Sequence, residues 1–162
     1  MLSNTALALK EKVMCRFSLF LAALMGLLHV TAAHAVTAVC KEPTGRIFGV
    51  HGTVLGKGKV LDEPDGMKGG MFTIVWNRGQ KQAQITSQGS GGGEPMTDTG
   101  IRVFESDEQI SFLVVYPSSV WLYSLYRKPK LLLMTAHNNG ASIDAGGAVV
   151  KSFKASCEIS ES

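Results

Sequence analysis

After residue 35 the sequence repeats one pattern, in which a short run of β-forming residues is followed by a turn signal, and almost no segment has helical periodicity. The turn signals contain residues that accept positive φ or cannot continue a strand ladder, as in Asn77-Arg78-Gly79-Gln80 and Pro117-Ser118-Ser119. Consecutive strands joined by short turns form an antiparallel meander, so the pattern predicts an all-β domain. The expected strands are 36–41, 46–55, 71–76, 81–86, 100–104, 109–116, 120–126, 130–136 and 148–158.

The first 35 residues have the pattern of an export signal. Two lysines and an arginine between residues 10 and 16 precede an apolar run over residues 17–30, and Ala33-His34-Ala35 has the small-x-small form of a cleavage site. A membrane-spanning helix needs about 20 apolar residues, so this run is short for an anchor. We therefore expect a signal helix over 1–35, cleaved after Ala35, and a single domain over 36–162 that is periplasmic or extracellular. Only an uncleaved signal would attach the protein to a membrane.

Removal of this segment changes the charge balance. The whole chain has 16 Lys and Arg against 13 Asp and Glu, and the signal contains three of the former and one of the latter. The mature domain therefore has 13 against 12, a formal charge of +1. Nucleic-acid binding needs a clustered positive surface, so we expect no nucleic-acid partner.

The mature domain keeps two cysteines, Cys40 and Cys157, one near each end. An even pair in an oxidising compartment predicts a disulfide. Apolar and polar residues alternate over 153–159 and over 36–40, which places both cysteines on the apolar faces of strands. The two terminal strands would then be neighbours, with their cysteines directed into the core.

Neighbouring terminal strands would close the sheet on itself, and closure removes exposed strand edges. We therefore expect a small antiparallel meander barrel of eight or nine strands, similar to the barrel of the lipocalins, with a two-sheet β-sandwich as the alternative. Two polar, glycine-rich stretches, 56–70 and 87–100, interrupt the pattern and are expected to be long loops.

The strands between 109 and 136 differ from the others because both of their faces are apolar. If Pro117–Ser119 forms a three-residue loop, Val115 pairs with Trp121 on one face. Whichever face packs on the core, the other needs a cover, and the candidates are a loop of this chain, a protein partner or second copy, or an apolar ligand.

Five aromatic residues in this region form the candidate binding surface. Trp and Tyr are enriched at recognition surfaces, although aromatic pairs on adjacent strands also pack well in a core. The candidates are Phe112, Tyr116, Trp121, Tyr123 and Tyr126.

No group of residues predicts catalysis, a metal site or a cofactor. His51 and His137 have no second His or Cys at ligand spacing. His51, Asp62 or Asp65, and Ser90 follow the chain order of one class of serine proteases, but a glycine precedes Ser90 where that class has Asp. A hydrolase is therefore a third hypothesis, and we expect a protein that is not an enzyme.

The layout of export signal, terminal cysteine pair and small β domain resembles that of the periplasmic inhibitors of c-type lysozyme. The functional loop of those inhibitors contains Ser-Gly-x-x-Tyr, and the nearest match here, Ser90 to Glu94, has Glu94 in place of the tyrosine. The resemblance therefore implies no site residue in this chain. The sequence favours an exported, non-catalytic binding module for a protein partner or a homodimer through the 109–136 face, with a carrier of an apolar small molecule as the alternative.

Overall fold

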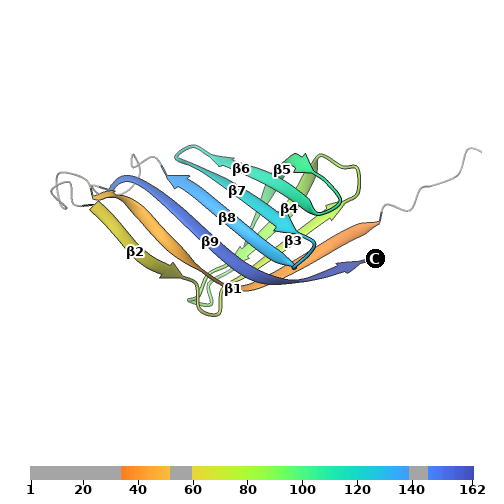
Figure 1. Ribbon diagram of the computed structural model, residues 1–162, viewed down its shortest axis with the longest axis horizontal. Coiled ribbons are helices and arrows are strands. Elements are labelled where there is room, and N and C mark those ends of the chain that lie inside the picture. Colours follow the sequence, from red (N-terminus) through yellow and green to blue (C-terminus); the bar gives the residue numbers. More distant parts are fainter. Residues whose placement is uncertain (1–33, 52–59, 139–145) are drawn as a thin grey trace, which may run out of the picture. The chain divides into compact units, whose positions relative to one another are not determined.

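The computed structural model describes residues 34–51, 60–138 and 146–162, so the predicted signal up to residue 33 lies outside the described residues. Within these ranges the chain forms nine strands, which confirms the all-β prediction (Figure 1). No helix in the described part of the chain is long and apolar enough to cross a membrane. The strands are β1 (Ala35–His51), β2 (Val60–Gly66), β3 (Met71–Asn77), β4 (Gln82–Gln88), β5 (Met96–Glu105), β6 (Gln109–Tyr116), β7 (Ser119–Tyr126), β8 (Leu131–Asn138) and β9 (Gly146–Glu161).

The strands form a closed antiparallel barrel with one extra strand. The order is β2-β1-β3-β4-β5-β6-β7-β8-β9, and β9 also pairs with β1. Strand β1 is long enough to have different neighbours along its length, because residues 35–41 pair with β3, residues 44–50 pair with β2, and β9 runs beside both parts (Figure 1). Eight strands, β1 and β3–β9, therefore close the barrel, which confirms the prediction of a meander barrel.

Strand β1 joins the two segments, 36–41 and 46–55, that were expected to be separate strands. The Pro-containing stretch between them forms a β-bulge instead of a turn, because three steps along β1 from Lys41 to Thr44 match only two steps along β9. The backbone N–H of Glu42, which has a φ of 50°, donates a hydrogen bond to a carbonyl next to β3. The bulge is thus the point at which β1 leaves β3 and continues beside β2.

The bulge also reverses which side chains of β1 face the barrel interior. Cys40 faces inward before it, and Gly45, opposite the buried Phe153, faces inward after it. One extra residue shifts the alternation of a strand by one position. From the alternation of residues 46–55 alone, Phe48 is expected on the core side of its strand. This expectation is wrong, because the shifted alternation leaves its side chain 40% exposed.

Strand β2 lies inside the stretch 56–70 that was predicted to be a loop. Its sequence, Val-Leu-Asp-Glu-Pro-Asp-Gly, is unlike that of a central strand because it has three acidic residues and Pro64. Both features are typical of an edge strand, where they hinder pairing with other chains. Asp62 accepts a hydrogen bond from Arg46 of β1, with an Nη2–Oδ1 distance of 2.6 Å, which fixes β2 to its neighbour.

Inward-facing apolar side chains fill the barrel. Trp76 packs against Phe112 with ring centroids 5.9 Å apart. Over 81–86 apolar and polar residues alternate, which predicts Ala83 and Ile85 on the inward side, and both are buried. The largest side chains that are fully buried include Trp76, Ile74, Ile85, Ile110, Phe112, Leu125, Leu132 and Met134.

The predicted disulfide is confirmed. Cys40 of β1 lies directly opposite Cys157 of β9, with Cα atoms 4.0 Å apart, and the two sulfur atoms are bonded. Both side chains are buried. The bond crosses the seam at which the last strand meets the first, and its presence supports an oxidising compartment.

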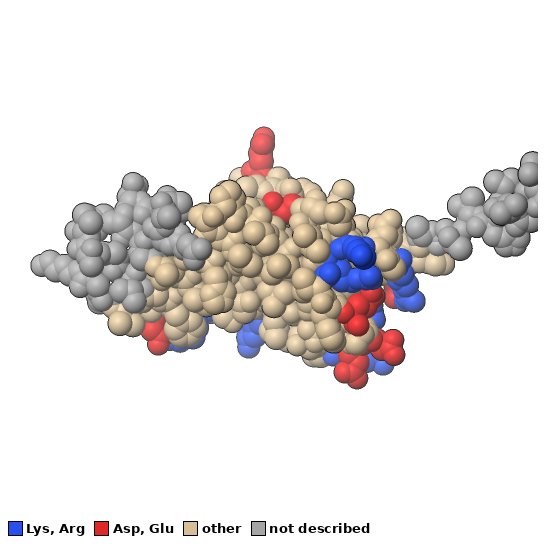
Figure 2. Space-filling model, turned by 90° about the horizontal axis from the view of Figure 1, so that it is seen from above, with Lys and Arg blue, Asp and Glu red and all other residues tan. Residues whose placement is uncertain are grey.

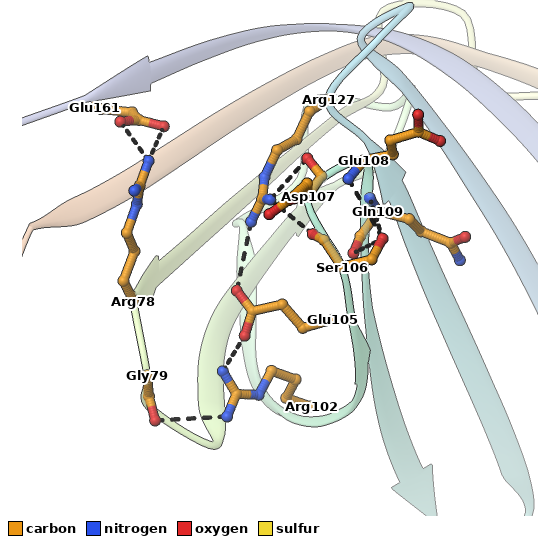
Figure 3. Close-up of polar contacts among 10 residues, drawn as sticks. All are labelled: Arg78, Gly79, Arg102, Glu105, Ser106, Asp107, Glu108, Gln109, Arg127 and Glu161. Carbon is orange, nitrogen blue, oxygen red and sulfur yellow. Dashed lines mark hydrogen bonds and ion pairs between the residues drawn. The ribbon is translucent and has the colours of Figure 1, made fainter.

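One end of the barrel is held by polar contacts between its hairpins, and we call it the polar end (Figure 3). The guanidinium of Arg127 donates hydrogen bonds to the backbone carbonyls of Ser106 and Asp107 at 2.8 and 3.0 Å. It also lies 3.4 Å from Glu105, which forms a second ion pair with Arg102. These contacts tie the β7–β8 hairpin to the β5–β6 hairpin.

Candidate functional site

A hollow of about 690 Å³ lies at the end of the barrel opposite the polar end, and we call it the mouth cavity. Its deepest residues, Phe72 and Tyr123, are buried, whereas Glu94 and Met96 near the β4–β5 connection are exposed. The cavity therefore has a buried floor and an exposed rim. Sites for small organic molecules have volumes of about 300–1,000 Å³, so the size fits such a ligand.

Aromatic rings form much of the wall of the mouth cavity. Trp121 and Tyr123, two residues apart on β7, stack with ring centroids 6.1 Å apart and planes 19° apart. Tyr123 also contacts Phe72 of β3, with centroids 6.0 Å apart. Trp121 and Tyr123 are aligned because alternate residues of a strand face the same way. Both lie on the inward face of β7, which forms part of the cavity wall.

A carboxylate and a phenol meet in the same wall. The hydroxyl of Tyr116 donates a hydrogen bond to Oδ2 of Asp98, and both residues line the cavity. Burial raises the pKa of Tyr116 well above its ordinary value, and the hydrogen bond to Asp98 and the charge of Asp98 raise it further. Burial likewise raises the pKa of Tyr123, with smaller contributions from Tyr116 and Asp98. Both phenols therefore stay protonated at neutral pH and can donate hydrogen bonds.

The five aromatic residues proposed from the sequence are divided among three places. Tyr116, Trp121 and Tyr123 come together in the mouth cavity. Phe112 is fully buried in the barrel interior, and Tyr126 pairs with Gln109 and Leu131 on the outside of the barrel. The sequence cluster thus contains three cavity residues, one core residue and one residue of the outer surface.

The predicted pairing of Val115 with Trp121 was wrong by one residue. The β6–β7 turn contains Pro117 and Ser118 alone, so Tyr116 pairs with Ser119 and Val115 pairs with Val120. A slip of one residue transfers every side chain of a strand to the other face. This is why Trp121 shares the inward face with the buried Val114 and not the outward face with Val115.

Several cavity residues were missed in the sequence, chiefly Asp98, Met96 and Glu94, because 87–100 was expected to be a loop. Strand β5 in fact begins at Met96. The sequence did contain a sign of this strand, because Met96, Asp98 and Gly100 alternate with two threonines. These three residues lie on the same face of the sheet as the inward Ile85 of β4. The surrounding glycines obscured it.

The outer surface of β5–β8 is the second candidate site, and we call it the apolar face. Strands β6, β7 and β8 contain no Asp, Glu, Lys or Arg. In Figure 2, which looks onto the side of the barrel where β6 lies in Figure 1, charged side chains gather mainly in the right-hand part and along the lower edge of the view. Six large hydrophobic residues on these strands are 37–62% exposed, namely Ile101, Val103, Phe104, Val115, Val120 and Leu133.

The apolar face occupies one side of the barrel. On β4 the outward residues are Gln82, Gln84 and Thr86, and on β9 outward positions alternate as Ser152, Lys154, Ser156 and Glu158. A sheet that meets water normally has polar side chains on that side, as β4 and β9 do. The outward positions of β6–β8 instead have no charged residue, and large apolar side chains such as Val115, Val120 and Leu133 are exposed among them.

The residues of the hydrolase hypothesis are not brought together as a group. Asp62 pairs with Arg46, and the carboxylate of Asp65 lies 3.2 Å from Nζ of Lys151. Ser90 is exposed in the β4–β5 connection, and the side chain of His51 lies outside the described residues. Among the side chains that the structure describes, no three His, Cys, Asp or Glu residues are grouped as metal ligands would be.

Comparison with protein-family models, with curated proteins and with solved structures finds no match to this chain. The mouth cavity and the apolar face are therefore the two features of the barrel that can indicate a function.

Proposed function

We propose that the protein is an exported, non-catalytic binding module whose apolar face docks onto a protein partner. The observation that carries this proposal is the exposure of six large hydrophobic side chains on β5–β8, because three of these strands, β6, β7 and β8, have no charged residue. Exposed apolar patches on soluble proteins mark interaction surfaces when they are contiguous. Depletion of charge at the centre is also typical of protein interfaces.

The face can be tested at Val115, which is 62% exposed and lies opposite Val120 at its centre. We expect Val115→Asp to weaken association on the order of tenfold or more, because it introduces a charge that the interface must desolvate. Gln84→Asp is the matched control, since Gln84 is exposed on the polar outer surface of β4. Cross-linking in the cell envelope followed by native mass spectrometry measures the complexes formed by each variant.

Loss of a heteromeric complex in Val115→Asp, with retention in Gln84→Asp, would support the proposal. Loss of a homodimer would instead assign the face to a second copy of this chain. A wild-type protein that remains an uncomplexed monomer, or a Val115→Asp variant that cross-links like the wild type, would contradict the proposal.

The export part of the proposal is supported by the disulfide and by the position of the predicted cleavage site. Cleavage after Ala35 would make Val36 the first residue, and Val36 is buried and pairs with both Trp76 and Glu161. We expect the intact mass of the protein from the cell envelope to match residues 36–162 less two hydrogen atoms for the disulfide. A mass that includes the first 35 residues would contradict cleavage, and a mass with two free thiols would contradict an oxidising location.

A second candidate function, the carriage of a small molecule, is supported by the mouth cavity. Below the mouth cavity, the interior of the barrel is filled by side chains such as Trp76 and Phe112. A ligand would therefore be held in the mouth cavity and not deeper along the barrel axis. The buried aromatic floor and exposed rim are the features that support it.

A further inference from the structure

The charged residues that line the mouth cavity are all acidic. Asp98 and Glu94 are among its lining residues, and the described part of the lining has no Lys, Arg or His. Lys151 lies on the strand next to the cavity wall, opposite Ala136, but its ammonium group is already paired with Asp65 at 3.2 Å. A ligand in the cavity would therefore meet a negative electrostatic potential.

Asp98 is the charged group best placed to contact a ligand. It lies opposite Ile85, whose side chain faces the barrel interior, so its own side chain also faces inward. Its hydrogen-bond donor is the uncharged hydroxyl of Tyr116, and no ion pair to Asp98 occurs among the described residues. A partly buried carboxylate with only a neutral donor gains most from a cation in the space beside it.

The walls beside Asp98 also favour a cation. The face of an aromatic ring attracts positive charge, and Trp attracts it more strongly than Tyr or Phe. Trp121 and the stacked Tyr123 provide such rings. The charge of Asp98 contributes to the raised pKa of both Tyr116 and Tyr123, so the same field that opposes a phenolate in this wall also opposes an anionic ligand.

We propose that the mouth cavity binds an organic ammonium ion, whose charged nitrogen lies beside Asp98 and whose apolar body lies against Trp121 and Tyr123. The proposal names a ligand class for the carrier function, on which it rests, and it is independent of the apolar face. A molecule with one cationic head and one apolar body matches the acidic and aromatic parts of the cavity together.

Three probes with the same apolar body test the ligand class on the mature, disulfide-bonded protein. 4-Phenylbutylamine has a cationic head, 4-phenylbutanol a neutral head and 5-phenylpentanoate an anionic head, each on the same phenylbutyl body. By titration calorimetry we expect the amine to bind on the order of tenfold more tightly than the alcohol, and the alcohol more tightly than the carboxylate. In Asp98→Asn the advantage of the amine over the alcohol should fall severalfold, because only the aromatic rings and Glu94 remain to favour the cation.

The matched control is Asp107→Asn, which removes the same charge from the β5–β6 hairpin at the polar end. This variant should keep the wild-type order of affinities. Tyr116→Phe is a second variant, because it removes the neutral donor but leaves the carboxylate. We expect it to bind the amine at least as tightly as the wild type, so the proposal remains testable if Asp98→Asn does not fold.

The binding site itself can be located by NMR because the chain has two tryptophans. Trp121 lines the cavity and Trp76 is buried in the interior, so the amine should shift the indole signal of Trp121 and leave that of Trp76 unchanged.

The outcomes separate the ligand class from the carrier function. Equal affinities for amine and alcohol, with a shift at Trp121, would overturn the cationic ligand and leave a carrier of neutral molecules. Preference for the carboxylate would also overturn it. If no probe binds saturably, or if the shift occurs at Trp76 instead, both the cationic ligand and the carrier function fail.

Discussion

Replacing both Cys40 and Cys157 by alanine is expected to lower the free energy of unfolding by about 4–5 kcal/mol. The disulfide joins residues 117 positions apart, and in the chain-entropy model a cross-link over about 100 residues restricts the unfolded chain by this amount. For a domain of this size, each kcal/mol shifts the melting temperature by about 4 °C. Urea unfolding of the mature protein measures the change directly.

Reduction of the wild-type protein is the control for this prediction, because it breaks the bond and leaves both side chains in place. Reduced wild type and the double variant should have similar stabilities, well below that of the oxidised protein. A difference of less than 1 kcal/mol between oxidised and reduced protein would mean that the barrel holds its seam without the bond.

The position of the disulfide also predicts an effect on folding rate. Pairing of β1 with β9 brings together the two ends of the domain, so it is the pairing with the largest sequence separation, and such contacts form slowly. The bond makes this pairing local in the oxidised chain. We expect the reduced protein to refold more slowly as well as to be less stable.

Local alternation in the sequence was sufficient to predict most of the barrel. Ala83 and Ile85, or Phe153, Ala155 and Cys157, alternate with polar neighbours, and each set faces inward as predicted. In these strands the inward face is predicted by several alternating residues together, so the prediction does not depend on any one of them. The paired cysteines then indicated that the first and last strands are adjacent, which led to the closed barrel.

The failures have a different physical origin, since each depends on a pairing partner that local sequence does not specify. The bulge near Pro43 adds one residue to β1 relative to β9, and this moved Phe48 to the outside. Strand β2 has too few apolar residues to be recognised in the sequence. It forms because the second half of β1 has unpaired backbone groups with which β2 can form an antiparallel ladder. A turn that contains Pro117 and Ser118, one residue shorter than expected, placed Trp121 opposite Val114 and not opposite Val115.

The candidate site depended on these same features. The sequence identified Tyr116, Trp121 and Tyr123 by their clustering, but it could not show that they share a cavity with Asp98, because that requires the register of β5 against β4 and the inward face of β7. Strands β6–β8 were recognised as apolar on both sides. The sequence did not show which residues lie on their outward side. The observed register shows that Val115 lies on that side and that Trp121 does not.

Phe112→Ala is expected to lower the free energy of unfolding by about 3–5 kcal/mol, the usual cost of deleting a buried phenyl ring. Phe112 is fully buried and its ring lies 5.9 Å from that of Trp76. The neighbouring strand has Gly100 at this level, where an added Cβ would come within 3.0 Å of the Cβ of Phe112 and 2.7 Å of Ile85. The barrel therefore has close packing around the ring and little means of filling the space that its removal would leave.

Val115→Ala, three positions further along the same strand, is the matched control. Val115 faces outward and is 62% exposed, so its truncation should change the stability of the monomer by less than about 0.5 kcal/mol. Urea unfolding of the two variants under identical conditions therefore tests the register of β6, because a slip of one residue would exchange the two effects. A large loss for Val115→Ala, or a small one for Phe112→Ala, would place the core on the opposite side of the strand. It would also remove the basis for treating Val115 as the centre of the apolar face.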